Sequence, residues 1–379
     1  MYRDDFVRRI HSPGGDRRGS RSMHLDIPLL VILAVICLTG LFVLYSASGQ
    51  SLYLVKRQAV FMLFGFISMI TVAQFPVRFW ERWAIVFYIG GLLALVAVMF
   101  YGVGAKGAQR WLDLGVTRVQ PSELMKVAVP MMVSSFLGNR YIPPSFQHIF
   151  ISLVLILLPV LLIVDQPDLG TAILVFTSGF FVLFLSGLGK RYLLSTFLLV
   201  MAAIPTLWVF VMRDYQKQRV LTLLSPEDDK LGAGWNIIQS TTAIGSGGLA
   251  GKGWMQGTQS QLNFLPESHT DFIIAVLAEE FGLIGVLVLC IAYFLFVGRC
   301  MLIALNSQSQ FGRLIAGSLS LTFFIYIFVN MSMVSGILPV VGVPLPLISY
   351  GGTSVVALFL GFGILMAIST EPKRIRMDL

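Results

Sequence analysis

The dominant pattern along the chain is a series of long apolar runs separated by short polar segments. The runs IPLLVILAVICLTGLFVLYSA (27–47) and WAIVFYIGGLLALVAVMFY (83–101) are each long enough to cross a bilayer, because a hydrocarbon core of roughly 30 Å requires about 20 helical residues. We therefore predict an all-α polytopic membrane protein with about ten transmembrane helices. Their predicted positions are near 27–47, 58–75, 83–101, 121–138, 148–164, 170–188, 192–212, 271–297, 313–334 and 353–369.

The composition supports this fold class. Of the 379 residues, 56% are hydrophobic and 12% are charged, whereas a soluble protein carries about twice that charged fraction. The surplus of apolar side chains must face lipid. The three cysteines, Cys37, Cys290 and Cys300, lie in or beside apolar runs, which is typical of small buried side chains and not of a disulfide or a metal site.

The distribution of lysine and arginine predicts the orientation in the membrane. If the N-terminus is cytoplasmic, basic residues are more numerous on the side of both termini than on the other side, as the positive-inside rule requires. We predict a basic cytoplasmic tail (1–26), a single ten-helix membrane domain (27–369) with a large extracytoplasmic loop (213–270), and a cytoplasmic tail (370–379).

The net charge of +8 is explained by this topology. The arginine-rich first tail is suited to resting on anionic lipid head groups. No basic stripe with interleaved aromatic residues is present, so the chain is not expected to bind nucleic acid.

The candidate site residues lie on the outer side, and Asp271 is the first among them. It lies in LPESHTDFIIAVLAEEFG (265–282), where an apolar run begins. Thr270 is expected to cap a helix, with Asp271 in its first turn, where the helix dipole favours a carboxylate. The pattern fits a capped helix at an interface. It equally fits a general base, because an ionised carboxylate at such a place can accept a proton.

A second group of candidates opens the fourth and sixth predicted spans. Glu123 and Lys126 are three residues apart in PSELMK and share one helix face, either as an internal ion pair or as part of a charged cavity. Asp168 in QPDLGT repeats the pattern of an acid at an outer helix start. Two or three such acids facing one cavity could bind a divalent cation, Mg²⁺ or Mn²⁺, through oxygen ligands.

Two acidic residues lie deeper in the eighth span. Glu279 is eight residues beyond Asp271, about 12 Å along a helix. A charge near the bilayer centre costs at least ~2.5–3.5 kcal/mol, so Glu279 and Glu280 need partners or protons. We interpret them as a buried polar clasp between helices.

The long outer loop and the last connection are rich in glycine and proline. The segment GSGGLAGKG (245–253) does not have the spacing of a phosphate-binding P-loop. It remains a glycine-rich loop that carries Lys252 and could bring backbone N–H groups to phosphates. WNIIQSTTAI (235–244) is expected to form a short interfacial helix. PVVGVPLPLISYGG (339–352) is irregular backbone that is tolerated at membrane depth only inside protein or beside a cavity.

Five of these motifs together resemble the SEDS (shape, elongation, division and sporulation) family. They are RWLDLGVTRVQPSELMK, QPDLGT, GSGGLAGKG, LPESHTDFIIAVLAEEFG and VPLPLISYGGTS, and they occur in the family's order over residues 102–354. The resemblance is greater to the elongation branch than to the division branch. It implies a GT-C-like helical fold in the bacterial inner membrane and a peptidoglycan glycosyltransferase, facing the periplasm, that polymerises lipid II during cell elongation.

The resemblance also implies roles and partners. Asp271 in the HTDF motif would be the catalytic base, beside His269, while Glu123, Lys126 and Asp168 match motif residues that contact substrate. Arg110, Lys126, Arg219, Lys252 or a divalent cation would stabilise the leaving undecaprenyl diphosphate. Expected partners are lipid II, membrane lipids, a class B penicillin-binding protein and other elongasome proteins.

Two other functions remain open at this point. A flippase for a lipid-linked precursor would also have about ten helices and buried charges. A scaffold that only recruits the transpeptidase would not depend on Asp271. Apart from Glu279 and Glu280, the candidate ionisable residues lie on the outer side instead of along a path through the membrane, which favours the enzyme.

Overall fold

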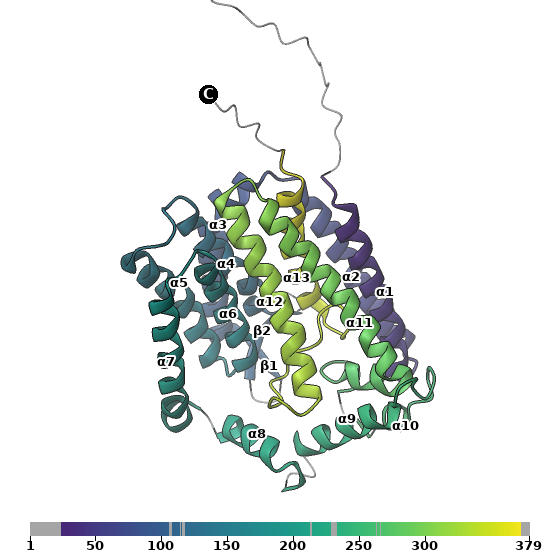
Figure 1. Ribbon diagram of the computed structural model, residues 1–379. Coiled ribbons are helices and arrows are strands. Elements are labelled where there is room, and N and C mark those ends of the chain that lie inside the picture. The colour runs from purple at the N-terminus through teal and green to yellow at the C-terminus, as the bar shows by residue number, and fades with distance from the viewer. Residues whose placement is uncertain are drawn as a thin grey trace, which may run out of the picture.

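The chain is almost entirely helical in a computed structural model (Figure 1) that describes residues 24–105, 108–113, 115, 118–212, 214–228, 233–262, 264–265 and 267–372. Each predicted span overlaps one helix, although the span predicted at 192–212 also includes η1 (Leu207–Val211). These helices are α1 (Ile27–Ala47), α2 (Leu52–Ala73), α3 (Val77–Tyr101), α4 (Pro121–Gly138), α5 (Phe146–Asp165), α6 (Leu169–Leu185), α7 (Lys190–Thr206), α11 (Ile273–Asn306), α12 (Gln310–Val334) and α13 (Gly352–Ser369).

Seven of the helices in the described part of the chain are long and apolar enough to cross a membrane: α1, α2, α3, α5, α11, α12 and α13. The helix α6 is apolar but shorter, with 17 residues. The protein is therefore a multi-pass membrane protein, while the count of ten spans stays a prediction. The predicted tail 1–26 lies outside the described residues up to residue 23, and the predicted tail 370–379 does so from residue 373.

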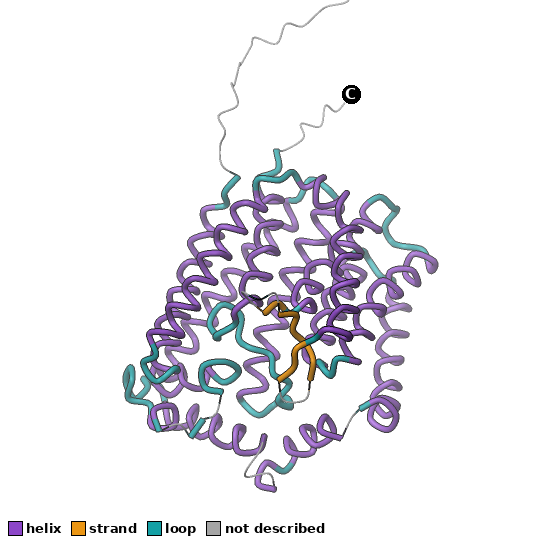
Figure 2. The backbone as a smooth tube through the Cα atoms, turned by 180° about the vertical axis from the view of Figure 1, so that it is seen from behind, coloured by secondary structure: helices purple, strands orange, loops and turns teal. Residues whose placement is uncertain are grey.

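Short elements gather at one end of the bundle. They include a three-stranded antiparallel sheet that the all-helical prediction did not contain: β1 (Val103–Ala105), β2 (Ala108–Asp113) and β3 (Arg118–Val119). The strand β2 contacts α3 and α4, and Figure 2 shows the sheet among the helices. The remaining short elements are η1 (Leu207–Val211), α8 (Asp214–Leu224), η2 (Pro226–Asp228), α9 (Ala233–Gly247) and α10 (Thr258–Gln261). The helix predicted over 235–244 is confirmed as part of α9.

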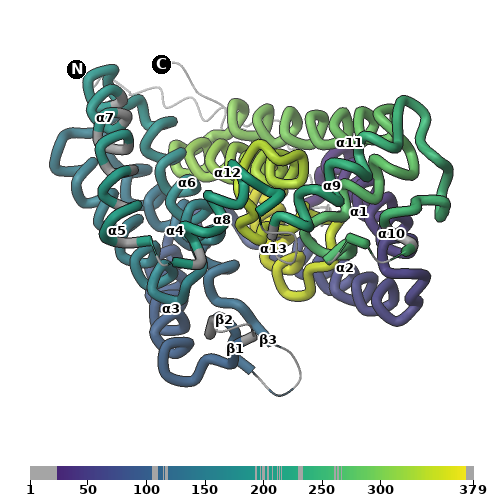
Figure 3. The backbone as a smooth tube through the Cα atoms, turned by 90° about the horizontal axis from the view of Figure 1, so that it is seen from below, coloured from purple at the N-terminus to yellow at the C-terminus, as the bar shows by residue number. Residues whose placement is uncertain are grey.

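Seen from this end, α12 and α13 lie at the centre of the molecule (Figure 3). On one side of them are α3–α7, and on the other are α1, α2 and α11. The helix α1 begins and α13 ends at the opposite end of the bundle (Figure 1), which agrees with the prediction that both termini lie on one side.

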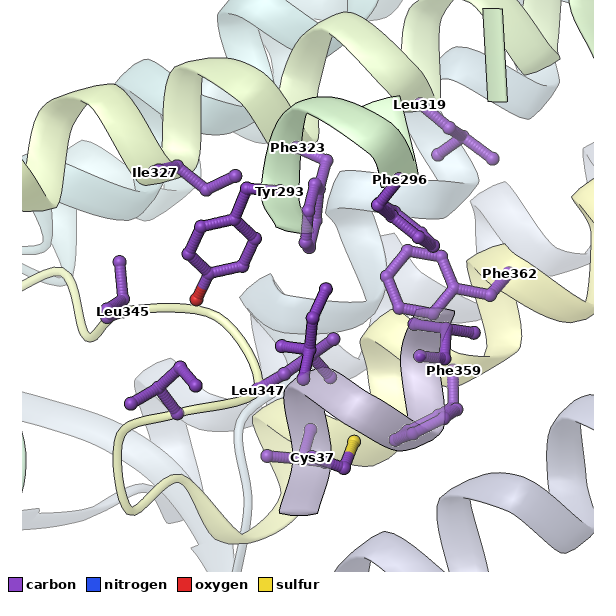
Figure 4. Packing of buried hydrophobic residues seen from close by; sticks show 14 of the residues in the cluster. Cys37, Tyr293, Phe296, Leu319, Phe323, Ile327, Leu345, Leu347, Phe359 and Phe362 are labelled. Atoms are coloured by element: carbon purple, nitrogen blue, oxygen red, sulfur yellow. The ribbon is translucent and has the colours of Figure 1, made fainter. Parts of the chain in front are cut away.

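Aromatic side chains pack between α11, α12 and α13 (Figure 4). The ring of Phe296 on α11 lies 4.7 Å from that of Phe323 on α12 and 4.9 Å from that of Phe362 on α13, measured between centroids. Nearby, the Tyr293 hydroxyl donates a hydrogen bond of 2.7 Å to the carbonyl of Pro346. This bond satisfies a polar group of the irregular connection between α12 and α13, which therefore tolerates burial inside the protein.

The helix α11 is interrupted at Gly282, where φ is 64° and ψ is −163°. The glycine-rich segment 245–253 docks onto this break. The amides of Lys252 and Gly253 donate to the carbonyls of Glu279 and Glu280, both at 3.0 Å, and the amide of Leu283 donates to the carbonyl of Gly248 at 2.9 Å. The break thus exchanges backbone hydrogen bonds with the loop, as buried polar groups require.

Candidate active site

A cavity of about 1120 Å³ opens at the end of the bundle that carries the sheet. It is formed where the starts of α4, α6, α11 and α13 meet the strands and the connection after α12. Five of the predicted site residues line it: Glu123, Asp168, Asp271, Arg110 and Arg219. Residues that are distant in sequence therefore converge on one polar cavity.

Asp271 lies at the cavity wall, directly before α11. The Asp271 side chain is partly buried. Its Oδ2 atom lies close to Gly342, since a Cβ atom added to that glycine would be 3.7 Å away. The prediction that Thr270 caps the helix is wrong, because the N-cap is Phe272 and makes no side-chain capping bond. The Thr270 hydroxyl instead donates to the carbonyl (3.2 Å) and Oε2 (3.1 Å) of Glu267, so Asp271 precedes the helix and does not lie in its first turn.

Glu123 and Lys126 form a buried ion pair at the start of α4. The Lys126 Nζ atom lies 2.7 Å from Glu123 Oε2, and both side chains are less than one-tenth exposed. The same ammonium donates to the Tyr326 hydroxyl at 3.3 Å and lies 4.3 Å from the centre of its ring. Glu123 and Tyr326 line the cavity, whereas Lys126 lies behind them.

Asp168 confirms the predicted acid at a helix start, because it is the N-cap of α6. Its Oδ1 accepts a hydrogen bond from the amide of Thr171 at 3.4 Å, and its Oδ2 accepts one from Gln120 Nε2 at 2.8 Å. Arg110 Nη1 lies 3.7 Å from Oδ1. The guanidinium of Arg110 also donates to the carbonyl of Pro167, so Arg110 is fixed against the start of α6 and faces the cavity.

Arginine is the main source of positive charge around the cavity. Arg219 on α8 donates to the carbonyl of Val340 at 2.9 Å. Sequence reasoning did not single out Arg57 or Arg118, which also line the cavity. Both belong to the basic residues that the predicted topology places on the outer side. This placement was the only sequence signal that they could lie near the cavity. Guanidinium groups suit phosphate oxygens because they donate in a planar, bidentate fork.

Besides Lys126, two further predicted substrate contacts, Lys252 and His269, do not line the cavity. Lys252 Nζ lies 2.8 Å from Glu279 Oε1 and 2.8 Å from the Thr258 hydroxyl. His269 is tied to the connection before α13, since its carbonyl accepts a hydrogen bond of 2.9 Å from the amide of Tyr350. Neither residue is placed against the acids of the cavity.

The predicted polar clasp within α11 is confirmed. Glu279 is fully buried, and its Oε1 accepts hydrogen bonds from Lys252 (2.8 Å) and from the amide of Gln259 (3.0 Å). The adjacent Glu280, 1% exposed, accepts a hydrogen bond from Ser46 on α1. These two acids join α11 to the glycine-rich loop and to α1.

The described residues do not form a binding site for a divalent cation. Within them, no three histidine, cysteine, aspartate or glutamate side chains are close enough together to hold a metal ion. Asp168 and Glu123 are already engaged by Arg110 and Lys126. The divalent cation stays a prediction, and no chemical step is assigned to it.

Comparison with known proteins agrees with this architecture. The chain is 55% identical over 351 residues to the peptidoglycan glycosyltransferase MrdB of Escherichia coli K12, covering 93% of this chain and 95% of that protein. It is 37% identical over 360 residues to the probable peptidoglycan glycosyltransferase FtsW of Geobacter metallireducens, covering 91% and 95%. The higher identity to MrdB, the RodA of E. coli, confirms the predicted resemblance to the elongation branch.

Solved structures show the same fold. One, described as "Structural coordination of polymerization and crosslinking by a peptidoglycan synthase complex", matches with a TM-score of 0.80 at 30% identity, covering 91% of this chain and 97% of that chain. The crystal structure of the rod shape determining protein RodA of Thermus thermophilus matches with a TM-score of 0.69 at 28% identity, covering 91% and 96%.

The family description "Cell cycle protein", which groups FtsW, RodA and SpoVE, matches residues 24–374. Because this match covers nearly the whole chain and includes every element of the cavity, the protein belongs to the FtsW/RodA/SpoVE family, as the SEDS resemblance predicted.

Proposed function

We propose that this protein polymerises lipid II into β-1,4-linked glycan strands during cell elongation, with Asp271 as the general base. The general activity, peptidoglycan glycosyl transfer, is that of a relative 55% identical over 93% of the chain. The single observation that carries the mechanism is the position of Asp271 on a cavity that is otherwise rich in arginine.

The chemistry requires activation of a weak nucleophile. Asp271 accepts the proton of the GlcNAc 4-hydroxyl of the incoming lipid II as this oxygen attacks C1 of the lipid-linked MurNAc of the growing strand. The C1–O bond to the diphosphate breaks, and its electron pair leaves with undecaprenyl diphosphate. A single displacement at C1 converts the α linkage into a β linkage, so the reaction inverts. Diphosphate leaves without protonation, which is why this site needs no second acid of the glycosidase type.

Arginines of the cavity suit the charge of the leaving group. Arg110 and Arg219 carry permanent charge, and each is held by hydrogen bonds to backbone carbonyls. Such pre-oriented donors stabilise a developing anion without reorganisation during the reaction. Arg57 and Arg118 add positive charge on the same cavity. Asp168 orients Arg110, and Glu123, held by Lys126, forms the wall beside Tyr326.

The site is assigned to the periplasmic face of the bacterial inner membrane. Support comes from the predicted bias of basic residues toward the side of the termini and from the position of the cavity at the other end of the bundle. The proposed partner is a class B penicillin-binding protein that cross-links the new strand. This proposal is supported by the matching structure, which is described as a complex that coordinates polymerisation and crosslinking.

A flippase for the lipid-linked precursor was the alternative because of the buried acids Glu279 and Glu280. Both are engaged in contacts between elements, with Lys252 and Ser46 respectively. They act as structural links and do not mark a path for a polar head group. The polar residues that line the cavity lie at one end of the bundle, which supports the enzyme.

The test is polymerisation by purified protein. Wild type and Asp271→Asn are incubated with labelled lipid II and Mg²⁺, with and without the transpeptidase partner, and the products are separated on a gel. We expect a ladder of glycan strands from wild type and a rate at least about 10²–10⁴-fold lower from the nearly isosteric variant, because a positioned base contributes that much. Wild-type activity in the variant would remove Asp271 from the mechanism. No ladder from wild type with its partner would point to lipid flipping, to be measured in liposomes.

A further inference from the structure

The backbone before α11 is held by the connection between α12 and α13. The carbonyl of His269 accepts a hydrogen bond from the amide of Tyr350 at 2.9 Å. The carbonyl of the next residue, Thr270, accepts one from the Ser349 hydroxyl at 2.5 Å. Consecutive carbonyls are therefore fixed by groups about 80 residues away in sequence, at a place where the chain is not helical.

The third carbonyl, that of Asp271 itself, is held by α12. Asn330 Nδ2 donates to it at 2.9 Å and also donates to the carbonyl of Val343 at 2.7 Å. One amide group thus joins the backbone of Asp271 to the backbone beside Gly342, a residue that lies near the Asp271 carboxylate. Because both acceptors are carbonyl oxygens, only a side chain with two donors satisfies them.

Asn330 is fully buried in α12, and this burial carries a cost. Its Oδ1 atom accepts no hydrogen bond from any residue that the structure describes. A buried acceptor without a partner is destabilising, so the folded chain retains this polar side chain at the expense of stability. An apolar residue would fill the position without that cost, but it would remove the hydrogen bonds to the carbonyls of Asp271 and Val343.

We propose that Asn330 is a positioning residue for the transferase reaction: through its two hydrogen bonds it fixes the Asp271 carboxylate relative to the wall formed by residues 341–343. This inference rests on the proposed function, in which Asp271 takes the proton of the acceptor hydroxyl. The amide does not touch substrate, since it is buried behind the backbone that lines the cavity. Loss of its donors displaces the base while leaving the substrate contacts of the cavity in place.

The experiment compares Asn330→Asp with the matched control Thr322→Val by initial polymerisation rates over a range of lipid II concentrations. Aspartate has the shape of asparagine, but its carboxyl donates at most one hydrogen bond and so cannot serve both carbonyls. Thr322 is a buried α12 residue whose hydroxyl donates only within its own helix, to Ser318 at 2.8 Å. We expect kcat of Asn330→Asp to fall about 10- to 100-fold, because a displacement of about 1 Å costs up to that much, with KM within about twofold of wild type.

A second variant keeps the inference testable if Asn330→Asp does not fold. Ser349→Ala removes the hydroxyl that holds Thr270, and it should likewise lower kcat selectively. Equal kcat values in Asn330→Asp and Thr322→Val would overturn the positioning role. A rise in KM with unchanged kcat in Asn330→Asp would also overturn it. If only Ser349→Ala folds, an unchanged kcat in that variant would overturn the role. These results have meaning only when wild type produces a ladder, so a failure of the proposed function is recognised separately, in the wild-type lane.

Discussion

At the scale of single residues, the Glu123–Lys126 pair combines a structural contact with a proposed functional role. The pair is buried with its atoms 2.7 Å apart, yet only Glu123 lines the cavity. Lys126→Met leaves a buried carboxylate without its cation, and breaking a buried pair in this way costs about 3–5 kcal/mol. We expect a corresponding loss in the free energy of unfolding, measured in detergent, whereas Lys190→Met, at an exposed position, should have little effect.

The double variant Glu123→Gln/Lys126→Met separates the two roles. It removes both charges, so stability should recover by a large part of the loss. If Glu123 contacts substrate, polymerisation stays low in this variant although the protein is folded, and we expect this outcome. Full recovery of both the polymerisation rate and the stability would mean that the Glu123–Lys126 pair has only a structural role. Thermal unfolding and initial polymerisation rates, measured on the same preparations, distinguish these two outcomes.

At the scale of elements, sequence patterns predicted the helices well because apolar length does not depend on tertiary contacts. The ranges 27–47 and 121–138 coincide with α1 and α4. Motif residues such as Asp168 were also found at the predicted helix starts. Asn330 was not predicted, because one polar residue inside an apolar run carries no sign of which backbone it faces. Arg57 was missed for a related reason, since its place on the cavity depends on how distant loops converge.

The contact between the glycine-rich loop and α11 is an element-scale feature with a direct test. A Cβ on Gly251 would lie 2.1 Å from the carbonyl oxygen of Glu280, whereas one on Gly248 would meet nothing within 4 Å. Both glycines have positive φ, +80° and +56°, so alanine at either position carries backbone strain of about 1–3 kcal/mol. The Gly251→Ala variant alone adds a collision with the backbone of α11.

We therefore expect Gly251→Ala to be less stable than Gly248→Ala. The loop should also separate from the break at Gly282, which would accelerate hydrogen exchange at the amides of Lys252 and Gly253. Hydrogen exchange measured by mass spectrometry on both variants provides the comparison. Equal stability and equal exchange in the two variants would show that the loop does not depend on close backbone approach.

At the scale of the whole molecule, α11 connects the two ends of the bundle. Its first residues follow Asp271 at the cavity, and its distant part carries Arg299, which binds Asp26 at the start of α1 with atoms 2.6 Å apart. Ser369 at the end of α13 donates to the same carboxylate. Asp26 thus joins three helices at the end of the bundle opposite the cavity, where the described chain begins and ends.

The charge of Asp26 gives this junction a defined pH dependence. Burial alone would raise the pKa of Asp26, but hydrogen bonds from Arg299, Ser369 and the amide of Leu29 outweigh it and hold the pKa below the ordinary value of 3.8. A carboxyl whose pKa is lowered by folding stabilises the protein above its unfolded pKa, and this contribution is lost as the pH falls through the folded pKa. Asparagine caps helices about as well as aspartate, so Asp26→Asn removes the charge and retains the cap.

We expect Asp26→Asn to melt at a lower temperature than wild type at pH 7, because Arg299 loses its anionic partner at a buried junction. The difference in melting temperature between the two proteins should persist down to about pH 4, near the pKa of Asp26 in the unfolded chain. Below that pH the difference should become smaller, because the wild-type carboxyl takes up its proton. Melting curves of both proteins between pH 3 and pH 7 measure this directly. A difference that is constant down to pH 3 would mean that packing, and not charge, joins α1, α11 and α13. A narrowing difference would identify an electrostatic junction that holds the ends of these helices together at the end of the bundle opposite the proposed site.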